Sequence, residues 1–203
     1  MQSSLSQHYV INNTITLSGD FEIEIDFQGY TAGTRSLFGG GPSAGQDFLA
    51  FFDATSVSFA VNGDTLVLPT PSVDDGKLHN IKLSRVGSLL SGTYDGGIAS
   101  TLTTSETCTI DLIGGNNQPS NLWDGIIANL KITDGSTLTH DLAFDTDLSN
   151  TTIVNKGTIG ATGNATTQNL FPADAELYEF DGSVSPNTWT GEVTMNVIEV
   201  AGT

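Results

Sequence analysis

The chain has 203 residues, with 23 acidic against six basic ones and a formal net charge of −17 at pH 7. The basic residues are scattered, whereas contacts to phosphates need clustered Lys and Arg, so the composition argues against a nucleic-acid partner. The same charge would be repelled by an anionic membrane surface, and no stretch has the length of a transmembrane helix, so we expect no membrane partner. Cys108 is the single cysteine, which rules out an internal disulfide and favours the role of a small buried hydrophobe.

Apolar and polar residues alternate along much of the chain, which is the pattern of half-buried strands. Residues 21–27 place four apolar side chains on one side and three carboxylates on the other, and shorter alternating runs follow at 57–61, 78–83 and 126–132. Gly-, Asn- and Asp-rich turn sequences separate these runs, as in a sandwich or barrel of short antiparallel strands. We expect a core that contains Phe21, Ile23, Ile25, Phe59, Val61, Ile81, Leu83, Ile126, Leu130 and Ile132.

The alternation weakens after about residue 140. Residues 145–170 are rich in Thr, Asn and Gly and carry few large apolar side chains, and regular alternation returns only near the end of the chain. The sequence therefore predicts a β-sandwich core over residues 1–140. It also predicts a C-terminal extension over residues 141–203, with an irregular loop and closing strands that pack on the same domain.

Several segments resemble, in the same order, the signature of laminin G-like domains. Gly76–Arg85 resembles the family's turn glycine, its Trp-His strand and the Arg that follows, with Leu78 where the family usually has Trp. Thr93–Gly96, Ile113–Gly115 and Trp123–Ile132 resemble the next strand and turn, the Ile-Gly-Gly strand and the aromatic-x-Gly strand, so that the likeness spans roughly residues 15–135. The resemblance implies an all-β fold, an antiparallel two-sheet β-sandwich of the jelly-roll, concanavalin A-like kind.

The same resemblance implies a calcium site at one rim of the sandwich. In laminin G-like domains the ion is held by an Asp before a strand, a carbonyl about one hairpin later, and an acidic or amide residue before the aromatic-x-Gly strand. The matching positions here are Asp47, the turn from Asn62 to Asp64, and Asn121. Such oxygen ligands suit Ca²⁺. The alternative is that Asp47 only begins a strand and Asn121 only turns the chain.

Enzymes also occur on concanavalin A-like folds, where glycosidases use a pair of carboxylates as nucleophile and acid. Residues 24–28 begin such a motif, but Gln28 and Gly29 stand where the last acid would be. Glu22, Glu24 and Asp26 remain on one strand face, where a solvated exterior is the simpler explanation. For His79 a packed, hydrogen-bonded role is favoured over a catalytic one. We therefore predict that the chain is not an enzyme.

The leading functional hypothesis is a binding module that recognises a carbohydrate or another surface ligand through its rim loops, because loops vary while a sandwich holds them in place. The residues after Met1 show no secretion signal, which predicts a virion, such as a phage tail, fibre or decoration protein, or an extracellular surface as the setting. Its partners would be a host-surface ligand and other virion proteins. The alternative is a purely structural virion or surface protein that makes protein–protein contacts in a symmetric homo-oligomer.

Overall fold

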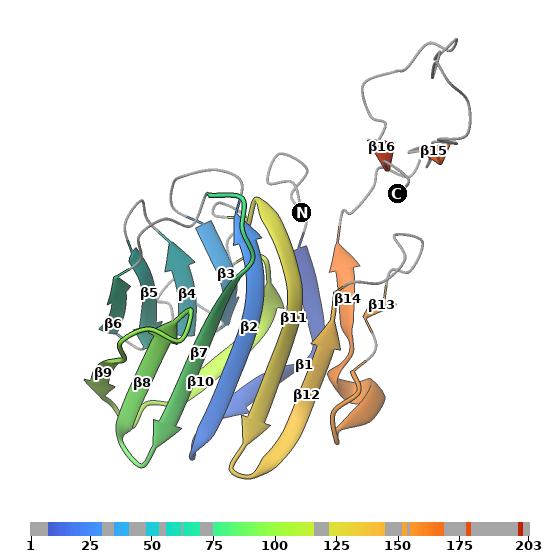
Figure 1. Ribbon diagram of the computed structural model, residues 1–203. Helices are drawn as coiled ribbons and strands as arrows, with labels where there is room; N and C mark the ends of the chain where they lie inside the picture. Colours follow the sequence, from blue (N-terminus) through green and yellow to red (C-terminus); the bar gives the residue numbers. More distant parts are fainter. Residues whose placement is uncertain are drawn as a thin grey trace. The chain divides into compact units, whose positions relative to one another are not determined.

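The computed structural model describes residues 8–29, 35–40, 48–52, 56–61, 63–69, 75–115, 122–144, 152–153, 155–168, 178–179 and 199–200. The larger of two antiparallel sheets contains, in spatial order, β13 (Thr152–Ile153), β14 (Ala165–Gln168), β1 (His8–Leu17), β10 (Cys108–Ile113), β3 (Arg35–Gly40), β4 (Phe48–Phe52), β5 (Ser56–Val61) and β6 (Asp64–Pro69). The smaller sheet contains β12 (Thr137–Ala143), β11 (Gly125–Asp134), β2 (Phe21–Gly29), β7 (His79–Val86), β8 (Leu89–Tyr94) and β9 (Ser100–Thr103). The predicted antiparallel two-sheet β-sandwich is confirmed (Figure 1).

The core lies between the two sheets and is built by the alternation that the sequence shows. On β2 the residues from Phe21 to Phe27 are buried at every second position, and Ile25 pairs with Ile81 of β7 on one side and with Leu130 of β11 on the other. Side chains on both flanking strands therefore add to the same apolar layer. Cys108 is fully buried, as predicted, and burial raises the pKa of its thiol to about 11.

One predicted core residue is on the wrong face. Ile126 is 42% exposed, whereas its neighbour Ile127 is buried. The cause is a β-bulge in β11, where the register with β2 shifts between Ile127 and Asn129. The extra residue of a bulge reverses the inward and outward positions on its two sides. The other predicted core residues are buried.

The chain divides into two compact units, residues 1–170 and 171–203. The residue at which the sequence predicts the core to end, 140, lies inside β12. The first unit includes β13, β14 and the 3-10 turn η2 (Gly160–Gly163), since β14 pairs with β1. Buried Asn155 fixes this segment to β12, because its side chain donates to the carbonyl of Thr139 at 3.0 Å and accepts from the amide of Asp141 at 2.7 Å.

In the second unit the described residues are β15 (Tyr178–Glu179) and β16 (Glu199–Val200), which pair in parallel. Across the parts of the chain that the structure describes, none of the secondary structure is a helix with the length and apolar character that a membrane span requires.

A buried arginine stands at the end of β7. Arg85 is 1% exposed, and its guanidinium donates to the carbonyls of Gly19 at 2.8 Å, Leu17 at 3.1 Å and Glu106. The same group lies 4.8 Å from the centre of the Phe21 ring, within the range of a cation–π contact. The single guanidinium of Arg85 thus donates a hydrogen bond to each of three backbone carbonyls at this end of the sandwich.

Buried His140 makes stability depend on pH. It lies opposite Ile132, its Nε2 atom has no hydrogen-bond partner, and burial lowers the pKa of its ring. At pH values between the ordinary pKa of about 6.5 and the lower pKa of the folded state, the ring is therefore protonated in the unfolded chain but not in the folded chain. Thermal melts at a series of pH values should show a falling Tm as the pH drops through this window. In His140→Leu, Tm should fall less over this pH window, because the variant has no ring to protonate. A pH dependence of Tm equal to that of the wild type would show that His140 is not its cause.

Candidate functional site

The site begins with a group of aromatic rings at one end of the sandwich. We call this end, where β2 ends, β7 begins at His79 and β8 ends at Tyr94, the His79 rim. The ring of His79 stacks on that of Tyr94, with centroids 5.1 Å apart, and Trp123 meets Phe27 edge-on at 5.5 Å. All four side chains are buried, so they form the end of the hydrophobic core on which the loops of this rim pack.

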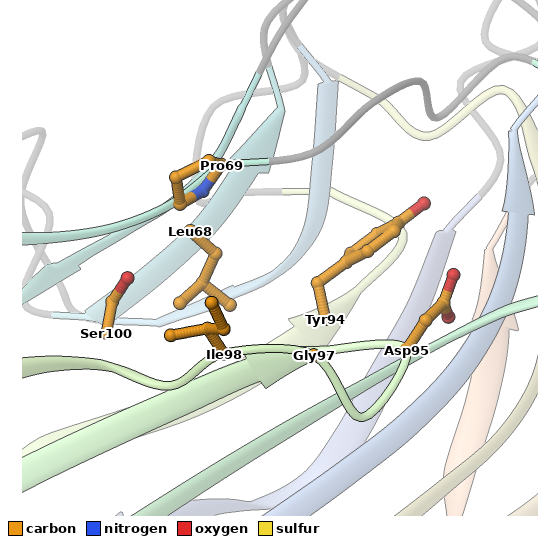
Figure 2. A pocket seen from close by; sticks show the side chains of 7 residues that line it. All are labelled: Leu68, Pro69, Tyr94, Asp95, Gly97, Ile98 and Ser100. Atoms are coloured by element: carbon orange, nitrogen blue, oxygen red, sulfur yellow. The ribbon is translucent and has the colours of Figure 1, made fainter.

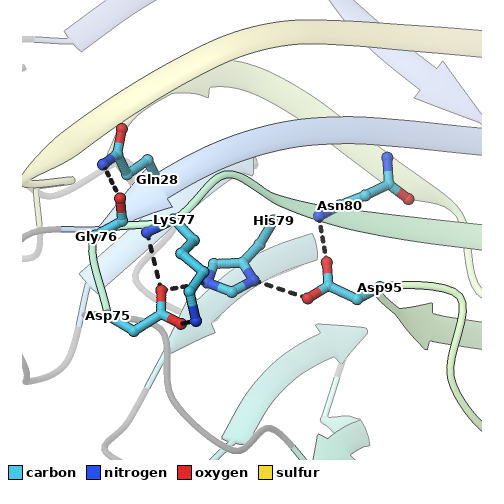
Figure 3. A network of polar contacts seen from close by, with 7 residues as sticks. All are labelled: Gln28, Asp75, Gly76, Lys77, His79, Asn80 and Asp95. Atoms are coloured by element: carbon cyan, nitrogen blue, oxygen red, sulfur yellow. Dashed lines mark hydrogen bonds and ion pairs between the residues drawn. The ribbon is translucent and has the colours of Figure 1, made fainter.

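His79 joins two carboxylates from different loops (Figure 3). Its Nδ1 atom lies 2.7 Å from Oδ2 of Asp95, and its Nε2 atom lies 2.9 Å from Oδ1 of Asp75. An imidazolium can donate to both, whereas a neutral ring can donate to only one. The hydrogen-bonded role predicted for His79 fits these contacts. The two ring nitrogens point in different directions, so the carboxylates that they bind do not converge on one ion.

The loop that carries Asp75 is fixed by further contacts. Lys77 donates to Asp75 from its backbone amide and from its Nζ atom, each at 2.9 Å. These bonds, with that from His79, hold the pKa of the Asp75 carboxyl well below its usual range. Beside them, the side chain of Gln28 donates to the carbonyl of Gly76. The loop is therefore tied to both β2 and β7.

Asp95 fixes the turn that follows β8. Its backbone has a positive φ of 50°, and its amide donates to the carbonyl of Asn80 at 2.8 Å. In return, Oδ1 of Asp95 accepts from the amide of Asn80 at 2.8 Å. Together with His79, these bonds set the position of the chain that leads from Tyr94 to Ile98.

A pocket with a volume of about 560 Å³ lies where this turn meets the end of β6 (Figure 2). Its walls come from both sheets: Leu68, Pro69, Tyr94, Asp95, Gly97, Ile98 and Ser100. Ile98 is 96% exposed, although burial is the usual state of a large apolar side chain. Burial, and then the charges of Asp95 and Asp75, raise the pKa of Tyr94 well above its usual value, so its phenol stays neutral.

The four residues proposed for calcium are not brought together within the described structure. Asp64 is exposed and opens β6, at the other end of that strand from Pro69. Asp47, Asn62 and Asn121 lie outside the described residues. Among the residues that are described, no three His, Cys, Asp or Glu side chains form a group suited to a metal ion. The calcium site thus stays a prediction.

The acidic row on β2 lies on the outer face of the smaller sheet, but its side chains are half-buried rather than fully exposed. Lys82 forms an ion pair with Glu22 at 2.9 Å. Asp26 accepts a hydrogen bond from Asn80 at 2.6 Å and another from Asn129. The row therefore belongs to a connected polar face.

The sequence interpretation did not identify Asp75, Asp95 or Ile98 as site residues. Asp95 is part of a Tyr-Asp-Gly-Gly sequence and Asp75 of an Asp-Asp-Gly sequence, and such sequences indicate a turn but no particular site. Their connection through His79 requires the pairing of β7 with β8.

Comparison with known proteins confirms the fold. No protein-family model matches the sequence, and no curated protein sequence matches it. Among solved structures, the LG1-3 region of the laminin alpha2 chain is similar with a TM-score of 0.52 and 17% identity, over 64% of this chain and 25% of that one. Domains LG4-5 of the mouse laminin alpha1 chain give a TM-score of 0.49 and 17% identity, over 70% of this chain and 44% of that one. The chain thus spans less than half of either laminin chain.

The prediction that the chain is not an enzyme is corrected by a third similarity. The alginate lyase AlgAT5 of polysaccharide lyase family 7 has a TM-score of 0.41 and 15% identity, over 60% of this chain and 62% of that one. Enzymes are therefore among the proteins of similar fold, and an incomplete glycosidase motif on β2 does not exclude catalysis.

Proposed function

We propose that the chain is a carbohydrate-binding module whose site is the pocket beside the His79 rim. The observation that carries this proposal is an almost fully exposed Ile98 in a pocket that is also lined by Asp95 and Ser100. A sugar ring presents apolar C–H groups on its faces and hydroxyls at its edge. A pocket of this size, with an apolar wall and a few polar groups, can contact both.

The hydrogen bonds around His79 support the proposal because they fix the pocket wall before a ligand arrives. The turn that carries Ile98 is bound to β7 through Asp95, and Asp95 is bound in turn to His79. A site that is already ordered loses less conformational entropy on binding than one that must be ordered by the ligand. Weak ligands such as single sugar rings gain most from this arrangement.

Replacing Ile98 tests the site. A glycan array identifies the bound glycans, and calorimetric titration of one of them compares Ile98→Ser with Val86→Ser. Val86 is 70% exposed at the far end of β7 and is the matched control. Burial of part of an isoleucine by the sugar is worth about 1.5 kcal/mol, so Ile98→Ser should weaken binding about tenfold. Equal affinities for the two variants would place the site elsewhere.

We keep a phage virion, or an extracellular surface, as the proposed setting, with other virion proteins as partners. This proposed setting is supported by the sequence interpretation alone. Immunogold labelling of purified phage particles tests the virion setting, and particles that carry none of this protein would contradict it.

We also keep the proposal of a calcium ion held by Asp47, the turn at Asn62 to Asp64, and Asn121. Calcium that binds only the folded state at 100 times its Kd would add about 2.7 kcal/mol of stability. For a chain of this size that is a rise in Tm of several degrees, at about 2–4 °C per kcal/mol. Melts with millimolar calcium and with chelator should show this rise in the wild type but not in Asp47→Ala. A rise of equal size in both would remove Asp47 from the site.

A further inference from the structure

We infer that the pocket beside the His79 rim selects uncharged sugar rings and rejects uronates, with Asp95 as the residue that determines this specificity. The inference rests on the proposed function and adds the class of ligand to it. Its first basis is the set of side chains that line the pocket, in which Asp95 is the one ionisable carboxylate and neither Lys nor Arg occurs. A ligand carboxylate would therefore meet the negative charge of Asp95 at this wall, and the lining has no Lys or Arg that could bind the ligand carboxylate.

The orientation of Asp95 leaves it able to bind sugar hydroxyls. Oδ2 accepts from Nδ1 of His79, and Oδ1 accepts from the amide of Asn80. Each carboxylate oxygen has two lone pairs, so one acceptor position remains on each. The side chain is 44% exposed, which leaves these positions accessible. Two adjacent acceptors suit the hydroxyl donors of a neutral sugar, whereas a ligand carboxylate has no proton to donate.

Lys77, which belongs to the same network around His79, does not offset the charge of Asp95. Nζ of Lys77 lies 2.9 Å from Oδ2 of Asp75, on the other side of the His79 ring from Asp95. Burial is the largest cause of the raised pKa of the Tyr94 phenol, and the negative field of Asp95 and Asp75 raises it further. A field that disfavours a phenolate in this wall also disfavours a ligand carboxylate beside it. A unit charge at contact distance, in a partly screened site, changes affinity about tenfold or more.

The local effect must be separated from the net charge of −17, which repels any anion. Asp95→Asn removes one charge in the pocket and keeps the size of the side chain. Glu106→Gln removes one charge at the opposite end of the sandwich, where the carbonyl of Glu106 meets Arg85. The two variants have the same net charge, so a difference between them reports the charge at the pocket.

The test uses pairs of β-1,4-linked hexasaccharides that differ only at C6, mannohexaose against hexamannuronate and cellohexaose against the glucuronate hexamer, titrated calorimetrically at low salt. The wild type should bind a neutral hexamer at least about tenfold more tightly than its uronate partner. Asp95→Asn should narrow this ratio, and Glu106→Gln should leave it unchanged. Raising the salt concentration should narrow the ratio in the wild type, which provides a measurement without a substitution.

The outcomes separate this inference from the proposed function. A uronate hexamer that binds the wild type as tightly as its neutral partner, with binding lost in Ile98→Ser, would overturn the specificity and leave the pocket as the carbohydrate site. The specificity would also be overturned if Asp95→Asn and Glu106→Gln reduced the preference for the neutral hexamer over its uronate partner by the same factor. If none of the four hexamers binds in a way that depends on Ile98, both the specificity and the proposed function are overturned.

Discussion

Replacement of Arg85 by Met should lower the free energy of unfolding by about 3 kcal/mol, because the carbonyls of Leu17, Gly19 and Glu106 lose the guanidinium that donates to them. The bond to Leu17 is buried and those to Gly19 and Glu106 are partly buried. A buried acceptor that loses its partner costs about 1–3 kcal/mol, and a partly buried one costs less because water can reach it. The apolar part of Met fills much of the volume of Arg85, so a cavity adds little to this loss. Urea denaturation followed by circular dichroism measures the change.

Lys82→Met is the matched control for Arg85→Met. Lys82 is on the same strand, carries the same charge and pairs with Glu22 on the solvent face. An exposed ion pair contributes at most about 1 kcal/mol, so this variant should remain close to the wild type. Arg85→Lys should be intermediate, since an ammonium keeps the charge but cannot reproduce the forked geometry of a guanidinium. Equal midpoints for Arg85→Met and Lys82→Met would show that the three carbonyls do not depend on Arg85.

Gly125→Ala should have an effect of similar size, about 3–5 kcal/mol, from backbone strain and overpacking together. Gly125 has a φ of +152°, and a Cβ atom there would lie 1.9 Å from the carbonyl oxygen of Gln28 and 2.9 Å from Nε1 of Trp123. The carbonyl belongs to the backbone of β2, so it cannot move without separating β2 from β11, where Gly125 pairs with Gly29.

Gly135→Ala separates the two causes of that loss. Gly135 also has a positive φ, of +60°, but a Cβ atom there would meet nothing within 4 Å. This variant should lose only the conformational term of about 1 kcal/mol. Thermal or urea unfolding of both variants gives the difference, which is the steric contribution at Gly125. A loss of the same size at both positions would mean that β2 and β11 are not as closely packed as the structure has them.

The alternation of apolar residues was sufficient to predict the fold class and most of the core. On β2 the period-two pattern fixed which side chains face inward, because one face of the strand is apolar and the other is acidic. On β11 the same reasoning was wrong at Ile126. The bulge between Ile127 and Asn129 adds one residue to β11. Since Ile126 and Ile127 are both apolar, the sequence alone does not show which of them faces the core.

The candidate site was predictable only in part. His79, at the start of β7, and Asp95, directly after β8, lie in segments that resemble a known domain signature, and their proximity follows from the pairing of these two strands. The pocket could not be predicted in this way, because its walls come from the end of β6 in one sheet and from the chain after β8 in the other. Periodicity within a strand carries no information about which loops meet between two sheets. Three of the four residues proposed for calcium lie outside the described residues, so their convergence stays a prediction.

The most direct test of carbohydrate binding at the His79 rim is a chemical-shift titration of the isotope-labelled protein with a glycan that it binds. The amides of Gly97, Ile98 and Ser100 should shift in proportion to occupancy, because they belong to the pocket wall. The amides of Gly87 and Gly135, in turns at the opposite end of β7 and β11, should not shift. Shifts confined to the outer face of the smaller sheet, around Asn80 and Asn129, with none at Ile98, would contradict the account.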